Sequence, residues 1–119
     1  MRPVFALLPV ILPLVVAKFH DMCACHSIKE SGAKLKYDWE LTMNNCMENF
    51  AGAAPYDHGL GNCVALPNFS IEGERFETDC YQLGVKDGFH PVDPKTGYMM
   101  GDKIIKVHWA EAKCHRLPR

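Results

Sequence analysis

Six cysteines constrain the fold of this chain more than any other feature, because the redox state of their thiols decides what holds the protein together. None of them lies in the first 22 residues. An even number of cysteines in a short exported chain predicts three disulfides. Six cysteines allow fifteen pairings, and the sequence alone does not select one. The six are Cys23, Cys25, Cys46, Cys63, Cys80 and Cys114.

The N-terminal segment indicates that the chain is exported. Residues 1–3 carry a positive charge, residues 4–16 are apolar, and the small residue Ala17 follows them, which is the arrangement of a secretory signal peptide. Val15 and Ala17 suit the positions three and one before a cut, so we expect cleavage after Ala17. A membrane anchor is the alternative, but it needs about 20 apolar residues, and two prolines interrupt this shorter run. We therefore expect secretion to the extracellular space and no stable membrane span.

Removal of residues 1–17 would leave residues 18–119, enough for a single disulfide-rich domain. Because Arg2 leaves with the signal, 12 of the 13 lysines and arginines remain against 14 acidic residues, a net charge of −2. No basic stripe is present to neutralise phosphates, so a nucleic acid partner is not expected. Asn68 begins an acceptor sequence for N-glycosylation, Asn68-Phe69-Ser70.

Two stretches have apolar residues at helical spacing. Asp38 is suited to cap the first helix, which we expect to run to about Phe50 and to end at Gly52. A second, shorter helix is expected over residues 73–83, with Gly84 as its stop. The apolar face of the first helix would consist of Trp39, Met43, Cys46, Met47 and Phe50, with Glu40, Asn44, Asn45, Glu48 and Asn49 mostly elsewhere, and that of the second of Phe76, Cys80 and Leu83.

Residues 22–27 are expected to form a strand. At period two, Cys23 and Cys25 would point to the same face and could not easily bond each other, so each must reach a different partner. Residues 62–66 predict a second strand. A third strand, expected between Leu66 and Gly73, has only a weak signal.

A hairpin is expected near the C-terminus, where residues 97–100 and 103–109 flank Gly101-Asp102. A glycine at the first central position of a two-residue turn suits type II′. Ile105, Val107 and Trp109 would form its buried face, and Cys114 would anchor a tail. The predicted fold class is α+β: a small disulfide-stabilised antiparallel sheet with two helices packed on it.

One candidate metal ligand is His20. In a reducing compartment the segment from His20 to His26 would suggest a transition-metal site, whereas after export its thiols are more readily used in disulfides. Cleavage after Ala17 would also create the terminus Lys18-Phe19-His20, whose amine, two amides and imidazole suit square-planar Cu(II) or Ni(II). No other cofactor is expected.

Hydrolase chemistry is an alternative that the residue types allow. His90, His108, Glu111 and Arg75 include the acid, base and cation that a small ribonuclease needs, but surface histidines are the simpler interpretation. The segment His20-Asp21-Met22-Cys23 resembles the His-Asp-x-Cys motif of secreted phospholipases A2, and this resemblance implies a lipase. No Gly-x-Ser-x-Gly elbow is present, and no thiol is left over as a nucleophile.

Apolar residues in the C-terminal third predict either a contact surface or a part of the core. The candidate surface residues are Phe89, His90 and Tyr98. A weaker alternative is an inhibitor of a protease or glycosidase that presents the loop of residues 85–96.

The cysteine layout of residues 22–84 resembles that of small secreted cysteine-rich proteins of filamentous fungi, many of which act as effectors on plant hosts. Many members carry an adjacent Cys-Cys pair on each helix, where this chain has Asn45-Cys46 and Cys80-Tyr81. The resemblance rests on Cys23-Ala24-Cys25, Thr42-Met43-Asn44-Asn45-Cys46, Gly61-Asn62-Cys63 and Phe76-Glu77-Thr78-Asp79-Cys80.

This resemblance implies a fold and a function. Some members have a killer-toxin-like α/β sandwich, in which a four-stranded antiparallel sheet carries two helices; a ferredoxin-like order is the alternative. The implied function is that of a non-enzymatic effector or toxin-like virulence protein. It would act as a monomer and bind an extracellular protein or glycan of a host. A small secreted hydrolase or an inhibitor is the alternative.

Overall fold

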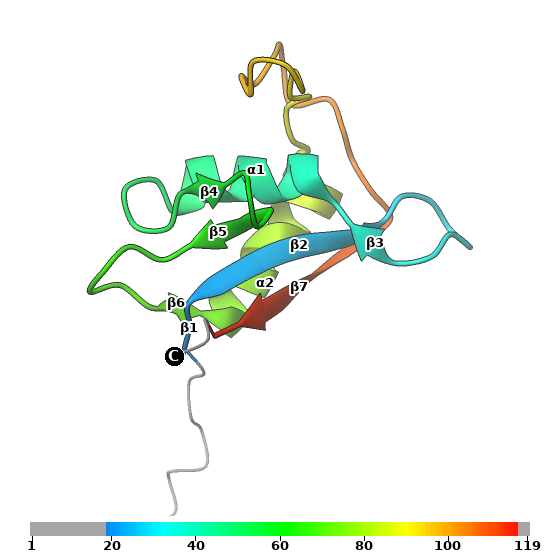
Figure 1. Cartoon of the computed structure of the whole chain (residues 1–119). Coiled ribbons are helices and arrows are strands. Elements are labelled where there is room, and N and C mark those ends of the chain that lie inside the picture. The colour runs from blue at the N-terminus through cyan, green and yellow to red at the C-terminus, as the bar shows by residue number, and fades with distance from the viewer. Residues whose placement is uncertain (1–18, 117–119) are drawn as a thin grey trace, which may run out of the picture.

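The strand β2 (Met22–Ile28) is the central element of the structure, and its position confirms the first predicted strand. In this computed structural model, which describes residues 19–116, β7 (Trp109–His115) pairs antiparallel with the whole length of β2 (Figure 1). Because β7 occupies one edge of β2, β5 (Asn62–Val64) and β3 (Lys36–Tyr37) share the other. The strand β4 (Tyr56–Asp57) extends this sheet beyond β5.

A short two-stranded sheet lies at the start of the described residues. It consists of β1 (Phe19–His20) and β6 (Ile71–Glu72), which pair antiparallel. The strand β6 falls in the interval between Leu66 and Gly73, where the strand signal in the sequence is weak. The predicted signal peptide, residues 1–17, lies outside the described residues. No helix within residues 19–116 has the length and hydrophobicity to cross a membrane.

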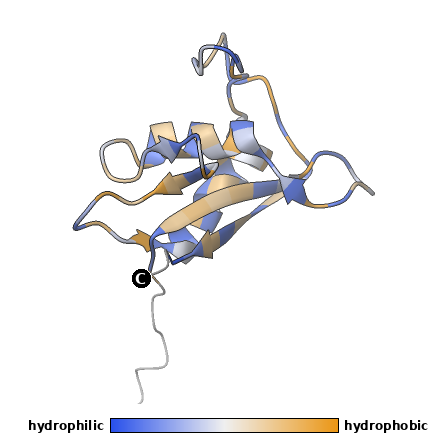
Figure 2. Cartoon of the chain, in the orientation of Figure 1, coloured by the Kyte–Doolittle hydropathy of each residue, from blue (hydrophilic) through white to orange (hydrophobic). Residues whose placement is uncertain are grey.

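Both predicted helices form and pack on the sheet. The helix α1 (Trp39–Asn49) contacts β2 and β5, and α2 (Gly73–Tyr81) contacts β7 and β2. Figure 2 shows that most of β2, which both helices contact, is hydrophobic. The fold is therefore α+β, with two helices on an antiparallel sheet and three disulfides, as the sequence predicts. The largest fully buried apolar side chains are Phe76, Phe89, Leu41 and Ile71.

Asp38 caps α1, as expected, and it also ties this helix to β2. One carboxylate oxygen, Oδ1, accepts a hydrogen bond from the backbone N–H of Leu41 at 3.0 Å. The other oxygen, Oδ2, accepts one from the Ser27 hydroxyl at 2.6 Å, and the Lys29 ammonium lies 3.3 Å from it. Thr42 completes the junction, because its hydroxyl accepts the backbone N–H of Cys25 at 2.8 Å. A buried carboxylate with several donors is the arrangement that fixes a helix start.

The three disulfides connect β2 and the two helices. Cys23 bonds Cys114 on β7, and Cys25 bonds Cys80 on α2, so the two neighbouring cysteines do reach different partners. The third disulfide joins Cys46, on the predicted apolar face of α1, to Cys63 and so ties this helix to β5. No cysteine is free. Three disulfides in so short a chain are typical of extracellular proteins.

The expected stop at Gly84 is wrong. The helix α2 continues without a break into a π-helical segment, η2 (Gln82–Asp87). This segment ends at Gly88, whose φ is +88°. Gly84 has a packing role instead, because a Cβ there would lie 3.0 Å from side-chain atoms of both Leu41 and Val107. The glycine permits close approach of three segments, which a sequence pattern cannot distinguish from a helix end.

The expected C-terminal hairpin is also wrong. Residues 97–100 and 103–109 do not pair with each other, although Gly101 does have a positive φ of +59°. Isolated bridges join Phe89 to Ile105 and Val92 to Met99, and the segment expected as a tail forms β7. The free edge of β2 offers seven paired residues, which outweighs a local turn preference.

We predict that the disulfides contribute unequally to stability. Cys46 and Cys63 are 17 positions apart, and Cys23 and Cys114 are 91 positions apart. In the chain-entropy description, closing loops of these lengths stabilises the folded state by about 3 and about 4.5 kcal/mol, respectively. The double substitution Cys23→Ala/Cys114→Ala should therefore lower the free energy of unfolding more than Cys46→Ala/Cys63→Ala. Guanidinium unfolding measures both values, and the reverse order would contradict this prediction.

We also predict that Asp79 on α2 makes stability depend on pH. Its Oδ2 atom is buried without a hydrogen bond and lies 3.8 Å from the Arg75 Nε atom. Desolvation raises the pKa of Asp79, and the Arg75 charge offsets only part of this effect. The folded state therefore favours the protonated carboxyl, and the resulting stabilisation, complete below the unfolded pKa of about 3.9, is lost as pH rises through the folded pKa.

Asp79→Asn should accordingly raise the melting temperature at pH 7, and this gain should shrink as the pH falls towards about 4. Asp102→Asn is the matched control, because it removes the same charge from an exposed position. Thermal unfolding at several pH values measures both variants. An equal gain for Asp79→Asn at every pH would contradict the prediction.

Candidate functional site

Residues 88–107, which we call the 88–107 loop, form the most prominent feature of the surface. In Figure 1 this yellow-to-orange segment rises above α1, away from the sheet. Its base is closed by two backbone hydrogen bonds between Phe89 and Ile105, of 2.9 and 3.1 Å. Nearer the tip, the Asp93 N–H donates to the Tyr98 carbonyl at 3.0 Å. The loop therefore has internal order from base to tip.

Asn44 on α1 holds this loop through a buried amide. Its Oδ1 atom accepts the His90 backbone N–H at 2.9 Å, and its Nδ2 atom donates to the His90 carbonyl at 2.9 Å. The Glu40 carboxylate accepts the N–H of Val92 at 3.1 Å. At the outer end, the Lys103 ammonium lies 2.8 Å from a Glu48 carboxylate oxygen. The polar positions of α1 are thus the supports of the loop.

The burial of Asn44 and Asn45 corrects the expected face of α1. Both are fully buried, while Met47 is 54% exposed. Asn45 lies beside the Cys25–Cys80 disulfide, with its Nδ2 atom 3.7 and 3.6 Å from the two sulfurs. Periodicity placed these amides mostly off the apolar face, because it does not show that the fold brings hydrogen-bond partners, such as the backbone of His90 and Phe76, to them.

The structure separates the three residues predicted for a contact surface. Tyr98 is 74% exposed, as a contact residue must be. His90 is half-buried and is held by Asn44, and its Nδ1 atom lies 2.8 Å from the Gly101 carbonyl. Phe89 is fully buried and anchors the base of the loop in the core, so it cannot belong to a surface. Met100, in the apolar segment expected to mark a contact surface, is 45% exposed, and sequence reasoning missed Ile104 of the same loop, which is 71% exposed.

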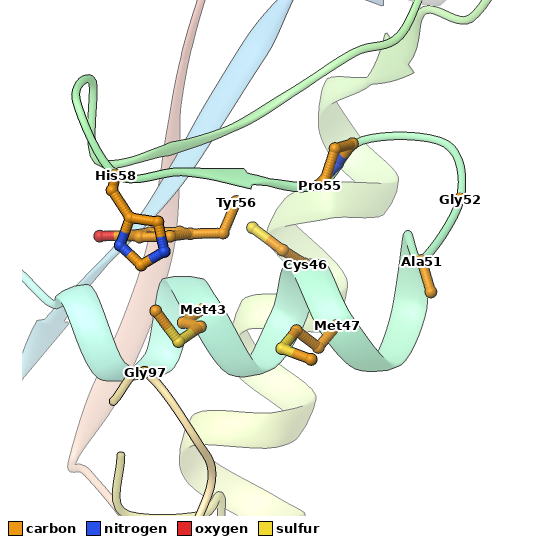
Figure 3. A pocket seen from close by; sticks show the side chains of 9 residues that line it. All are labelled: Met43, Cys46, Met47, Ala51, Gly52, Pro55, Tyr56, His58 and Gly97. Atoms are coloured by element: carbon orange, nitrogen blue, oxygen red, sulfur yellow. The ribbon is translucent and has the colours of Figure 1, made fainter. Parts of the chain in front are cut away.

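A pocket of about 340 Å³ lies beside α1 and reaches Gly97, near the tip of this loop (Figure 3), and we call it the α1 pocket. Figure 3 shows Met43 and Met47 of α1 on one side and the rings of Tyr56 and His58 on the other, with Gly97 of the 88–107 loop at the rim. The Tyr56 and His58 rings meet edge to face, with centroids 5.0 Å apart. Thioethers and an aromatic ring form an adaptable apolar lining, which suits an apolar side chain of a ligand.

Tyr37 fixes the aromatic wall of the α1 pocket from behind. Its hydroxyl donates to the Gly61 carbonyl at 2.6 Å and lies 3.2 Å from the Tyr56 hydroxyl. Burial raises the pKa of Tyr37, and the Tyr56 hydrogen bond adds to this effect, so the phenol stays protonated. Gly61 has a φ of +71°, and a Cβ there would lie 2.7 Å from the Tyr37 hydroxyl. The glycine is therefore required for this contact.

The residues proposed for hydrolase chemistry are not joined in the structure. His90 is held at the base of the 88–107 loop, whereas the exposed His108 precedes β7 and donates its backbone N–H to Ile28. Arg75 is paired with Asp79, and Glu111 stands opposite His26 on β2. Among residues 19–116, no hydrogen bond or ion pair connects any two of His90, His108, Glu111 and Arg75.

No metal cluster appears among the described residues, where groups of three or more His, Cys, Asp or Glu side chains are concerned. His20 lies on β1 and is half-buried. The expected Cu(II) or Ni(II) site also needs Lys18, which lies outside the described residues. His26, the other histidine of the N-terminal segment, has a pKa lowered by burial and by the nearby Lys113 charge.

Asn68 lies in an exposed turn between β5 and β6. The Phe69 N–H donates to the Leu66 carbonyl at 3.0 Å, and Asn68 has a φ of +71°. Pro67 and Asn68 thus take the central positions of a type II turn. The acceptor amide of the glycosylation sequence stands on the surface, while its modification stays a prediction.

Comparison with known proteins finds no relative: no family model, curated protein or solved structure matches this chain. The resemblance to secreted fungal proteins and the killer-toxin-like order therefore stay predictions. The function has to be inferred from the surfaces of the molecule.

We predict that Asn44→Leu releases the 88–107 loop from α1. The substitution keeps the side-chain size but leaves the part-buried N–H and carbonyl of His90 without their side-chain partners, which costs about 1–3 kcal/mol. Amide hydrogen exchange should accelerate at His90 and Val92 more than in β2. The control is Lys103→Met, which removes the solvent-exposed ion pair and should cost at most about 1 kcal/mol. Equal exchange rates in the two variants would contradict the prediction.

Proposed function

We propose that this protein is an exported, disulfide-stabilised binding protein that acts as an effector or toxin-like virulence factor on a host. Its contact surface consists of the 88–107 loop and the adjoining α1 pocket, and its target is an extracellular protein of the host. The observation that carries the proposal is an exposed apolar loop held in place by a buried amide, that of Asn44.

The exposed side chains of the loop favour a protein as the target. Tyr98, Ile104 and Met100 expose large apolar area at one end of the molecule. Tyrosine and methionine are enriched in protein–protein interfaces, and isolated apolar patches of a soluble domain often mark such sites. The α1 pocket at the rim of the loop offers space for an apolar side chain of the target.

The supports of the loop give it a second property of binding surfaces. Ordering a flexible loop on association costs conformational entropy, and this cost is avoided when the loop is already fixed. The hydrogen bonds of Asn44 and Glu40 and the Phe89 anchor supply that order before binding. A rigid projecting loop is also what an inhibitor presents to an enzyme, and here the projecting part is residues 88–107, whereas Val85 to Asp87 of the expected inhibitor loop belong to η2.

A capture experiment with matched surface variants tests this proposal. The purified protein is immobilised and exposed to extracellular fluid of a host, alongside Tyr98→Ser, Ile104→Ser and the control Phe19→Ser. Phe19 is 49% exposed on β1, which lies at the opposite end of the molecule from the loop (Figure 1). We expect a target whose affinity, measured with purified components, falls at least about tenfold in both loop variants and stays unchanged in the control.

Three outcomes would overturn the proposal. The first is a target that binds all four proteins equally, and the second is a glycan that binds in place of any protein. The third is turnover of RNA or phospholipid that His90→Ala or His108→Ala abolishes, which would favour the hydrolase alternative. We would therefore assay His90→Ala, His108→Ala and the loop variants for hydrolysis of RNA and phospholipid.

A further inference from the structure

A second concave site lies between α2 and β7 and shares no residue with the 88–107 loop or the α1 pocket. Its volume is about 370 Å³, within the range of small-molecule sites, about 300–1,000 Å³. In Figure 1, α2 lies behind β2 and β7, and the contacts between α2 and β7 place this cleft at their junction. We call it the Trp109 cleft; it is lined by Glu77, Thr78, Tyr81, Trp109, Ala110 and Glu111.

Two aromatic rings form a corner of this cleft. Tyr81, the last residue of α2, and Trp109, the first residue of β7, have ring centroids 5.2 Å apart and an interplanar angle of 68°. Trp109 is 44% exposed, so part of its ring is open to a ligand. The face of an indole or phenol ring attracts a cation, and ammonium groups with alkyl substituents are the ligands for which aromatic corners are used.

Two carboxylates of the Trp109 cleft have no cationic partner. The Glu77 Oε2 atom accepts the N–H of Ala112 at 3.0 Å, which holds this carboxylate against the middle of β7, and Oε1 has no partner among the described residues. Glu111 forms no hydrogen bond or ion pair with a described residue. Its charge acts on His26, which stands opposite it on β2, and Lys113 stands two positions along the same strand. The cleft therefore carries two carboxylates that form no ion pair with any residue of the described range, 19–116.

We propose that the Trp109 cleft binds a small organic ammonium ion. The aromatic corner would receive the alkyl groups around the nitrogen, and the Glu77 and Glu111 carboxylates would balance its charge. An alkylated nitrogen suits this cleft better than an inorganic cation, because two of the lining side chains offer ring faces and only two offer carboxylate oxygens. A neutral molecule of the same shape would leave both carboxylates uncompensated.

The fluorescence of Trp109 can report directly on ligand binding in the Trp109 cleft. The chain has two tryptophans, Trp39 and Trp109, so in a Trp39→Phe background the fluorescence comes from Trp109 alone. We would titrate this protein with choline chloride and, separately, with 3,3-dimethylbutan-1-ol, the uncharged carbon analogue of choline. Sodium chloride at matched concentrations controls for ionic strength. We expect a saturable signal with choline and at least about tenfold weaker binding of the neutral analogue.

Isosteric variants assign the effect to the two carboxylates. Glu77→Gln/Glu111→Gln removes both charges while the glutamine oxygen at position 77 can still accept the Ala112 N–H, so the cleft should keep its shape. This double variant should lose at least about tenfold in choline affinity, whereas the exposed Asp102→Asn should change nothing. Indole and amide shifts of Trp109 and Tyr81 in NMR spectra, recorded on the same samples, verify that the variants are folded and locate the ligand.

The proposal is overturned if choline and its neutral analogue bind equally, if neither gives a saturable signal at tens of millimolar, or if the double variant keeps its choline affinity. These results would leave the 88–107 loop untouched, since Tyr98→Ser and Ile104→Ser alter no residue of the Trp109 cleft. Failure of ammonium binding in the Trp109 cleft would therefore not contradict protein binding by the 88–107 loop, and the reverse also holds.

Discussion

The two disulfides of β2 are the constraint on which the rest of the structure depends. Cys23 binds β2 covalently to β7, its neighbour in the sheet, and Cys25 binds it to α2, which packs on the sheet. Because β2 also pairs with β3 and β5, these bonds fix β7 and α2 to the central strand of the five-stranded sheet. The core consists of few large apolar side chains, so crosslinks that reduce the entropy of the unfolded chain replace the area that a larger domain would bury.

Buried polar groups link this scaffold to its surfaces. Asp38 and Thr42 attach α1 to β2, and on the same helix Asn44 attaches the 88–107 loop. Each of these groups has its hydrogen bonds satisfied inside the protein, which is the condition under which a buried polar side chain specifies geometry. The helix α1 is therefore fixed to the disulfide-bonded core and in turn fixes the 88–107 loop, whose main contribution to the core is Phe89.

The two surfaces differ in chemistry, and the difference indicates two kinds of ligand. The 88–107 loop projects apolar side chains outward and adjoins an apolar pocket, as a protein-binding surface does. The Trp109 cleft is concave, aromatic and acidic, which favours a small cation. Both rest on the same disulfide-bonded strand, since β7 pairs with β2 along its whole length and α1 is capped against it.

The sequence by itself determined the elements that local chemistry specifies. Asp38 before an apolar period of 3.6 predicts α1, and the spacing of Cys23 and Cys25 rules out a bond between them. Only the tertiary structure decided the disulfide pairing, the strand of residues 109–115, and the roles of Gly84, Asn44 and Phe89. Each of these depends on a partner distant in the chain: the free edge of β2, the side chains that crowd Gly84, the peptide group of His90, and the core that receives Phe89. Periodicity and turn preferences describe neighbours in sequence, so they cannot show which distant group satisfies a strand edge or a buried amide.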